Sequence, residues 1–227
     1  MEKITILIPV FNEKNSLLEL LKKVEELDFN LEKEIILIDD FSTDGTKELY
    51  ENISHKVLYH ECNQGKGAAL RTGIKEASGD IIIIQDADLE YNPSDYLPLV
   101  ELIKNNEADV VYGSRFADQR NNGNFLLLSF IANKTLTLLT NILFGAKLTD
   151  METCYKAFRK EFIKNINIKS NRFDFEPEIT AKVLKQKVRF KELPISYNAR
   201  TNEEGKKIGW KDGVQAIFTL IKFRFFD

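Results

Sequence analysis

Four consecutive isoleucines at positions 81–84 constrain the fold more than any other stretch of this sequence. A short run of β-branched apolar residues is typical of a strand that is buried on both faces. Such strands occur in the middle of mostly parallel sheets flanked by helices. We therefore predict an α/β fold with a Rossmann-like, mostly parallel central sheet.

The isoleucine run is followed closely by Asp86 and Asp88. Because side chains alternate along an extended chain, these two carboxylates face the same side and lie roughly 6–7 Å apart. Carboxylates this close repel each other unless a cation lies between them. We predict that a divalent metal binds at this position and holds an anionic ligand. The alternative is that the two carboxylates are simply solvated where the strand leads into a loop.

Acidic residues also follow two other apolar segments that we expect to be strands. Residues 4–10 lead to Glu13, and residues 35–38 lead to Asp39 and Asp40. Parallel strands that are connected by helices present their carboxyl ends along one edge, where ligands of open α/β sheets bind. At least five carboxylates are expected to converge there, which points to a metal, a hydrogen-bonded nucleotide or both.

Composition excludes several classes of protein. The 227 residues suit one domain, and a net charge of −3 argues against general nucleic-acid binding. Two cysteines and two histidines exclude a zinc cluster and provide no disulfide framework. No uncharged apolar run of about 18 residues is present, so we predict no membrane span and a cytoplasmic location.

The rest of the chain alternates between expected helices and strands. Further strands are expected at 56–60, 109–113 and 188–197, and helices at 16–27, 46–52, 68–77, 93–106, 174–185 and 209–226. Residues 125–144 are apolar apart from Ser, Thr, Asn and Lys134. This stretch fits either plain core or an interfacial helix that admits a lipid tail. The aromatic and basic tail at 222–226 fits shallow membrane contact as well as helix docking.

Several short motifs in this order resemble family 2 glycosyltransferases of the GT-A fold. They are Pro-Val-Phe-Asn-Glu at 9–13, Asp-Asp-x-Ser-x-Asp-Gly-Thr at 39–46, Asn-x-Gly-Lys-Gly at 63–67, Asp-Ala-Asp at 86–88 and Gly-Ser-Arg-Phe at 113–116. The stretches at 149–158, 175–178 and 197–213 look like the branch that acts on polyprenyl or dolichyl phosphate, which includes dolichol-phosphate mannosyltransferases. The resemblance covers nearly the whole chain.

The resemblance implies one GT-A domain over residues 1–227, with a nucleotide-sugar half at 1–115 and an acceptor half at 116–227. It implies a metal-dependent, inverting enzyme that moves a hexose, mannose or glucose, from GDP-mannose or UDP-glucose. The donor would be bound by Pro9, Phe11, Glu13, Asp39 or Asp40, Lys66, Asp86, Ala87 and Asp88. Mg²⁺ or Mn²⁺ would be held by Asp86 and Asp88, with Glu90 as a plausible further ligand because hard cations favour oxygen.

The family resemblance also implies an acceptor site. A lipid phosphate is already largely ionised at neutral pH, because its second pKa is about 6, so it needs positioning and charge neutralisation more than a general base. The residues implied around this phosphate are Arg115, Lys134, Arg200 and Lys206 or Lys207. The implied catalytic residues are Asp88, Arg115 and either Asp150 or Glu152, which would orient the acceptor or act as a base.

Other interpretations remain open at this point. Lys134 on an apolar helix can simply extend its ammonium to solvent. The same fold can use a sugar hydroxyl as acceptor in polysaccharide or surface-glycan synthesis, where Asp150 or Glu152 would serve as the base. A third hypothesis is a non-catalytic nucleotide-sugar-binding partner of a membrane protein. Any membrane attachment is expected to be peripheral.

Overall fold

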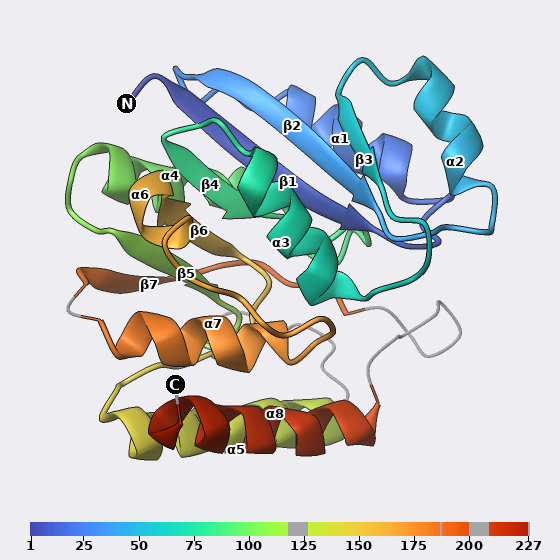
Figure 1. Cartoon of the computed structure of the whole chain (residues 1–227). Coiled ribbons are helices and arrows are strands. Elements are labelled where there is room, and N and C mark those ends of the chain that lie inside the picture. The colour runs from blue at the N-terminus through green and yellow to red at the C-terminus, as the bar shows by residue number, and fades with distance from the viewer. Residues whose placement is uncertain (118–126, 187, 200–208, 227) are drawn as a thin grey trace.

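The computed structural model describes residues 1–117, 127–186, 188–199 and 209–226. It contains one seven-stranded sheet in the order β3-β2-β1-β4-β6-β5-β7 (Figure 1). The strands are β1 (Lys3–Val10), β2 (Glu32–Asp39), β3 (Lys56–Tyr59), β4 (Ile81–Ile84), β5 (Val110–Ser114), β6 (Lys156–Arg159) and β7 (Phe190–Pro194). The helices are α1 (Leu17–Glu25), α2 (Thr46–Leu49), α3 (Lys66–Glu76), α4 (Tyr96–Lys104), α5 (Leu127–Phe144), α6 (Lys160–Ile163), α7 (Phe175–Leu184) and α8 (Trp210–Phe225), with 3₁₀ turns at Tyr50–Asn52 and Pro93–Asp95.

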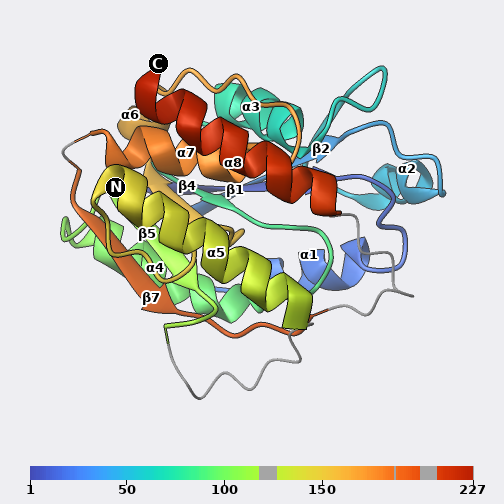
Figure 2. The same cartoon turned by 90° about the horizontal axis from the view of Figure 1, so that it is seen from below.

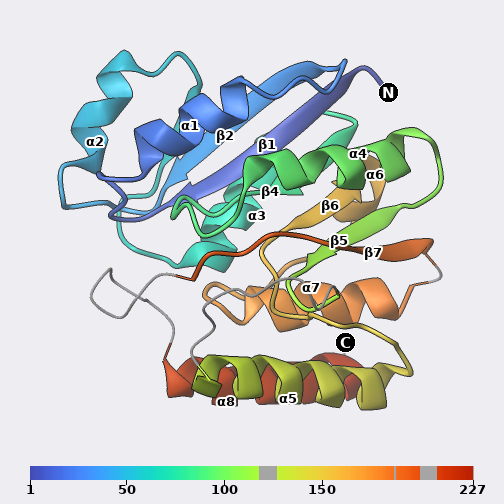
Figure 3. The same cartoon turned by 180° about the vertical axis from the view of Figure 1, so that it is seen from behind.

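The isoleucine strand β4 lies in the middle of this sheet, as predicted. It pairs in parallel with β1, which pairs in parallel with β2, and the four isoleucines of β4 are at most 1% exposed. Helix α3 covers one face of these strands, whereas α1 and α4 cover the other (Figures 1 and 3). Burial on both faces explains why the strand sequences are continuous apolar runs rather than alternating ones.

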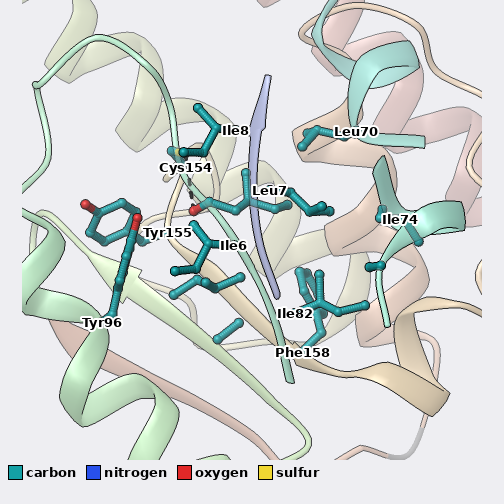
Figure 4. Close-up of a cluster of buried hydrophobic side chains, with 14 of the residues drawn as sticks. Ile6, Leu7, Ile8, Leu70, Ile74, Ile82, Tyr96, Cys154, Tyr155 and Phe158 are labelled. Atoms are coloured by element: carbon teal, nitrogen blue, oxygen red, sulfur yellow. Dashed lines mark hydrogen bonds between the residues drawn. The ribbon is translucent and has the colours of Figure 1, made fainter. Parts of the chain in front are cut away.

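The side chains of β1 divide between the two faces of the sheet (Figure 4). Leu7 points toward Leu70 of α3, whereas Ile6 points to the opposite face, toward Tyr96 and Tyr155. These five side chains and that of Ile8 are fully buried. This continuous core holds the carboxyl ends of β1, β2 and β4 at fixed positions along one edge.

The sheet is not entirely parallel, and the exception was not predicted. Among the described strands, β6 alone runs antiparallel to its neighbours, β4 and β5. It is four residues long and begins with Lys156, which is fully buried. A short strand that opens on a lysine lacks the apolar pattern that identifies the others. The sheet also crosses the predicted boundary at 115/116, since β6 and β7 both pair with strands of the first half.

Two long helices form a separate layer below the sheet. Helices α5 and α8 lie side by side, with α7 between them and the strands (Figures 1 and 2). Leu136 of α5 and Ala216 and Leu220 of α8 are buried in one cluster with Leu148 and Met151 from the segment that follows α5. In the described part of the chain no helix is both long enough and apolar enough to cross a bilayer.

The packing of α3 on the sheet predicts opposite outcomes for two glycine-to-alanine changes. A Cβ added at Gly73 would lie 2.7 Å from Cδ1 of Ile38 and 3.1 Å from Cδ2 of Leu7, so Gly73→Ala overpacks the core. We expect it to lower the free energy of unfolding by about 1–3 kcal/mol. A Cβ at Gly213 in α8 meets nothing within 4 Å, so Gly213→Ala should raise stability by up to about 1 kcal/mol.

Urea unfolding of both variants beside the unchanged protein measures this difference. Equal effects of the two substitutions would contradict the close approach of α3 to the sheet.

Candidate active site

The acidic residues that follow β1, β2 and β4 meet at one edge of the sheet. In the strand register Val10 of β1 lies beside Asp39 of β2, and Leu7 of β1 lies beside Ile84 of β4. The carboxyl ends of the three strands are therefore close together along this edge of the sheet. Each strand is followed by a residue other than glycine with a left-handed backbone: Asn12 at φ 54°, Phe41 at φ 69° and Leu89 at φ 62°. Conformations of this kind cost of order 1–3 kcal/mol and cluster at functional sites. Their position marks this edge as the candidate site.

Asp39 and Asp40 are both buried and bonded within the chain. Asp39 accepts hydrogen bonds from the Tyr50 hydroxyl at 2.8 Å and the Ser42 backbone N–H at 3.0 Å. Asp40 interacts with His60 at 2.7 Å and accepts from the backbone N–H of Gly65 at 2.7 Å. Asp40 therefore shapes the glycine-containing loop that opens α3. The role of either carboxylate toward a nucleotide stays a prediction.

A chain of alternating charges runs through the centre of the site. Lys66, the first residue of α3, places Nζ 2.8 Å from Oδ1 of Asp86 and 3.1 Å from Oε1 of Glu176 on α7. Glu176 also pairs with the buried Lys156 of β6. Burial alone would lower the pKa of Lys66, but the nearby carboxylates, Asp86 first among them, raise it well above its usual value. Lys66 is therefore a permanent cation beside Asp86.

Oxygen ligands suited to a divalent metal are present in the Asp-Ala-Asp turn. Asp86 and Asp88 are both partly exposed, while Ala87 between them is buried. Asp88 accepts a hydrogen bond from the backbone N–H of Glu90 at 3.2 Å, and the Glu90 carboxylate accepts one from Tyr197 at 2.9 Å. Asp86 already attracts the ammonium of Lys66, which shows that this position favours a cation.

The turn is nevertheless not a complete metal cage by itself. Within the residues that the structure describes, no three His, Cys, Asp or Glu side chains gather in a way that could hold a metal. Hard divalent cations such as Mg²⁺ are commonly held by one or two carboxylates together with substrate phosphates. The turn fits a metal that arrives with a diphosphate, and Glu90 as a further ligand would have to exchange its bond with Tyr197.

Arg115 and Asp150 form a buried ion pair. The guanidinium donates from Nε and Nη2 to the two carboxylate oxygens at 2.7 and 2.8 Å, and the Arg115 backbone N–H donates to the same carboxylate at 3.0 Å. Asp150 is 0% exposed. Burial opposes the charge of Arg115, yet Asp150 raises the pKa of the guanidinium well above its ordinary value. Both oxygens of Asp150 are engaged, so Asp150 is better suited to fixing Arg115 than to taking a proton.

Glu152 lies two residues further on in a different environment. Its Oε1 is buried and has no hydrogen-bond partner in the described part of the chain. Burial and the nearby charge of Glu176 raise the pKa of Glu152 to about 7, although Lys156 and Arg115 oppose the shift. A general base works best with a pKa near the operating pH. A role of Glu152 in proton transfer stays a prediction.

The predicted acceptor residues Arg115 and Lys134 approach each other across one aromatic ring. The guanidinium carbon of Arg115 is 5.4 Å from the ring centroid of Phe116, and Nζ of Lys134 is 4.4 Å from the same centroid. Lys134 also donates to the Thr149 carbonyl at 3.3 Å. No carboxylate among the described residues pairs with Lys134, so its charge is available to an anion. We call Arg115, Phe116 and Lys134 the cationic cradle.

The remaining predicted residues have different positions. Pro9 and Phe11 are half-buried at the end of β1, and Glu13 is buried and accepts a hydrogen bond from the Ser16 hydroxyl at 2.6 Å. Arg200, Lys206 and Lys207 lie outside the described residues. Sequence reasoning did not find Glu176, Lys156 and Tyr197 as site residues. The stretches that contain them entered the sequence analysis only as part of the family resemblance, and the partners of Lys156 and Glu176 come from distant segments.

The sheet order, the acid-rich edge and the helices on both faces define a glycosyltransferase of the GT-A class. Residues 5–166 match the model of glycosyl transferase family 2, and the chain belongs to that family. Among solved structures it is similar to glucosyl-3-phosphoglycerate synthase from Mycobacterium tuberculosis in complex with Mn²⁺, UDP and phosphoglyceric acid, with a TM-score of 0.78. That match is 18% identical and covers 100% of this chain and 80% of the other, so it supports the fold alone.

Curated relatives are more similar in sequence. An uncharacterized protein of Methanocaldococcus jannaschii is 31% identical over 99% of this chain and 93% of its own length. Dolichol-phosphate mannosyltransferase of Pyrococcus furiosus is 30% identical over 97% of this chain, which spans 64% of that enzyme. Dodecaprenyl-phosphate galacturonate synthase of Rhizobium johnstonii is 29% identical over 99% of this chain and 67% of its own length. The predicted family is confirmed, and relatives named for polyprenyl or dolichyl phosphate match most of the chain.

The environment of Glu152 predicts a variant that is more stable above neutral pH. The pKa of this carboxyl rises from an ordinary 4.5 to about 7 on folding. The folded state therefore holds an extra proton between these values, and stability that is present below pH 4.5 is lost as the pH rises to about 7. Glu152→Gln should raise the free energy of unfolding at pH 8 by on the order of 2 kcal/mol, with no change near pH 4.

Urea unfolding at the two pH values measures the effect, and Glu101→Gln on the exposed face of α4 is the control. A Glu152→Gln effect of the same size at both pH values would contradict the raised pKa.

Proposed function

We propose that this protein transfers a hexose from a nucleotide-diphosphate sugar to a polyprenyl or dolichyl phosphate, with inversion at the anomeric carbon. The observation that carries the proposal is the cationic cradle, where Lys134 has no carboxylate partner among the described residues and Arg115 presents its guanidinium to the same ring. A site that keeps an uncompensated ammonium next to a fixed arginine suits a phosphate group. The curated relatives named for such acceptors support this interpretation.

The donor would lie along the acid-rich edge, with its diphosphate at the Asp-Ala-Asp turn. Asp86 and Asp88 would hold Mg²⁺ or Mn²⁺, and Lys66, already 2.8 Å from Asp86, is close enough to pair with a diphosphate oxygen instead. A divalent metal, when bound, supplies positive charge that stabilises the leaving nucleotide. Pro9, Phe11 and Glu13 at the end of β1 are the proposed contacts of the base and ribose, and GDP-mannose and UDP-glucose are the candidate donors.

The acceptor phosphate would attack the anomeric carbon directly. Its oxygen forms the new bond as the bond from the sugar to the nucleotide diphosphate breaks, so one displacement inverts the centre. Arg115, held by Asp150, and Lys134 fix the phosphate and offset its charge. A phosphate with a second pKa of about 6 still carries a proton part of the time at neutral pH. Glu152, with a pKa of about 7, can accept that proton with little change in free energy.

The same carboxyl favours a second candidate function. A sugar hydroxyl is a weak nucleophile that needs a positioned base, and Glu152 has the pKa that this task requires. Transfer to a hydroxyl in polysaccharide or surface-glycan synthesis is therefore the alternative. The two functions differ in whether the cationic cradle contacts the acceptor.

To test the acceptor, the protein is mixed with a water-soluble, short-chain prenyl phosphate and each candidate donor. The rate at which the nucleotide is released is then measured. We expect release to require the prenyl phosphate, and Lys134→Gln to raise the KM for it about tenfold, since a hydrogen bond to a charged group contributes about 1.5–3 kcal/mol. Lys147→Gln, an exposed lysine beyond the same helix, is the control. Transfer to a free oligosaccharide with none to prenyl phosphate would establish the alternative function instead.

The metal site is tested separately through nucleotide binding. We expect Asp88→Asn to abolish turnover and to remove the increase in affinity for UDP or GDP that Mn²⁺ gives the unchanged protein, as measured by calorimetry. The control is Asp80→Asn, at the opposite end of β4, which should preserve turnover and the increase in nucleotide affinity that Mn²⁺ gives. Normal turnover by Asp88→Asn with an unaltered response to Mn²⁺ would show that the metal is bound elsewhere.

A further inference from the structure

Glu192 of β7 is a half-buried carboxylate that holds two consecutive residues of another segment. It accepts hydrogen bonds from the backbone N–H of Thr149 at 2.8 Å, from the Thr149 hydroxyl at 3.2 Å and from the backbone N–H of Asp150 at 3.3 Å. No cation among the described residues forms an ion pair with Glu192, and its neighbour Lys191 pairs with Glu107 instead. Within the described part of the chain, the segment at 149–150 is therefore what holds this carboxylate.

These contacts suit a carboxylate better than its amide. An ionised carboxylate only accepts hydrogen bonds, so it can face two backbone N–H groups and a hydroxyl at once, whereas glutamine would turn an N–H toward one of them. Glu192 also orders the neighbouring hydroxyls. Because Thr149 donates to Glu192, the Ser114 hydroxyl must donate to Thr149, from which it is 2.6 Å away. The Ser114 oxygen in turn accepts from the backbone N–H of Phe116 at 3.1 Å, so one directed chain of hydrogen bonds leads from Phe116 to Glu192.

All three residues of the cationic cradle are attached to the segment that Glu192 holds. Arg115 is paired with Asp150 through two side-chain hydrogen bonds and one from its backbone. Lys134 donates to the Thr149 carbonyl at 3.3 Å. Phe116 reaches Thr149 through the chain of hydroxyls described above. A shift of the 149–150 segment would therefore move the whole cradle.

We propose that Glu192 is a positioning residue for the acceptor phosphate. It acts through the 149–150 segment, which sets the distance between Arg115 and Lys134 and their orientation about the ring that they share. The inference deepens the proposed function and rests on it only for the identity of the anion. Binding sites lose much of their effect when supporting residues let the contacting groups move by roughly 1 Å. The loss should therefore fall on the acceptor and spare the donor.

A general contribution to stability is the competing explanation, and Glu34 provides a matched control for it. Glu34, near the start of β2, accepts hydrogen bonds from the backbone N–H of Ser78 at 2.8 Å and from the Ser78 hydroxyl at 2.7 Å. It thus holds a separate segment in the same way as Glu192 does, but at the end of the sheet opposite to the candidate site. Glu192→Gln and Glu34→Gln both keep the volume of the side chain and remove its charge.

Hydrogen exchange at the Arg115 side chain tests the positioning role without reference to catalysis. The Nε–H of Arg115, which donates to Asp150 at 2.7 Å, is observed by NMR in the full chain with ¹⁵N-labelled arginine and identified by its loss in Arg115→Lys. We expect Glu192→Gln to speed its exchange with solvent about tenfold or more, because a loosened segment opens the ion pair more often. Glu34→Gln should leave the rate unchanged. The same rate in Glu192→Gln as in the unchanged protein would overturn the proposal.

Kinetics then show which substrate depends on Glu192. We expect Glu192→Gln to raise the KM for a water-soluble, short-chain prenyl phosphate about tenfold and to leave the KM for the nucleotide sugar unchanged. Combined with Lys134→Gln, the rise should be smaller than the product of the two single rises, because both changes act on one site. Glu34→Gln should alter neither KM. An equal rise in both KM values would indicate a general structural role and overturn the proposal.

The two measurements distinguish a failure of this inference from a failure of the proposed function. If the unchanged protein transfers sugar to no prenyl phosphate, the proposed function is wrong, and faster exchange in Glu192→Gln would still show that Glu192 holds Arg115 in place. If transfer to prenyl phosphate occurs and Glu192→Gln changes neither the exchange rate nor the KM for the acceptor, the positioning role is wrong and the function stands.

Discussion

The ion pairs that converge on Lys66 connect the parts of the candidate site. Its ammonium lies between Asp86, at the end of the central strand, and Glu176, on a helix from the other half of the chain. A charge that is buried without a partner costs several kcal/mol, so neither half can arrange its own charges alone. The orientation of Asp86 therefore depends on α7 as well as on β4. One continuous series of ion pairs therefore connects the two halves of the chain at the candidate site.

Two acids that are two residues apart, Asp150 and Glu152, have different surroundings. Asp150 is paired through both oxygens with Arg115, so its charge is fixed and its work is to hold a cation in place. Glu152 has a buried oxygen with no hydrogen-bond partner among the described residues, and burial together with the charge of Glu176 raises its pKa. Pairs of titratable groups whose environments separate their pKa values are a common way to divide structural and chemical roles. The spacing in the sequence could not reveal which acid was which.

Local pattern was enough to predict the central strands and the edge where their acids meet. The isoleucine run of β4 and the apolar residues of β1 and β2 are consistent with burial on both faces, and this pattern is visible in one sequence. Strand β6 was missed because its first residue is a buried lysine whose charge is balanced by Glu176, a partner twenty positions away. The pairing of Lys66 with Asp86 was missed for the same reason. Contacts between distant segments leave little trace in local pattern.

The late position of β6 in the sequence determines when the central strand β4 can gain its second neighbour during synthesis. It sits between β4 and β5, yet it follows both of them and all of α5 in the sequence. During synthesis on a ribosome, the isoleucine strand therefore emerges with one flank unpaired until residue 159 has been made. Unpaired strand edges attract other chains. A nascent molecule halted before that point leaves one edge of its isoleucine strand open to pairing with another chain.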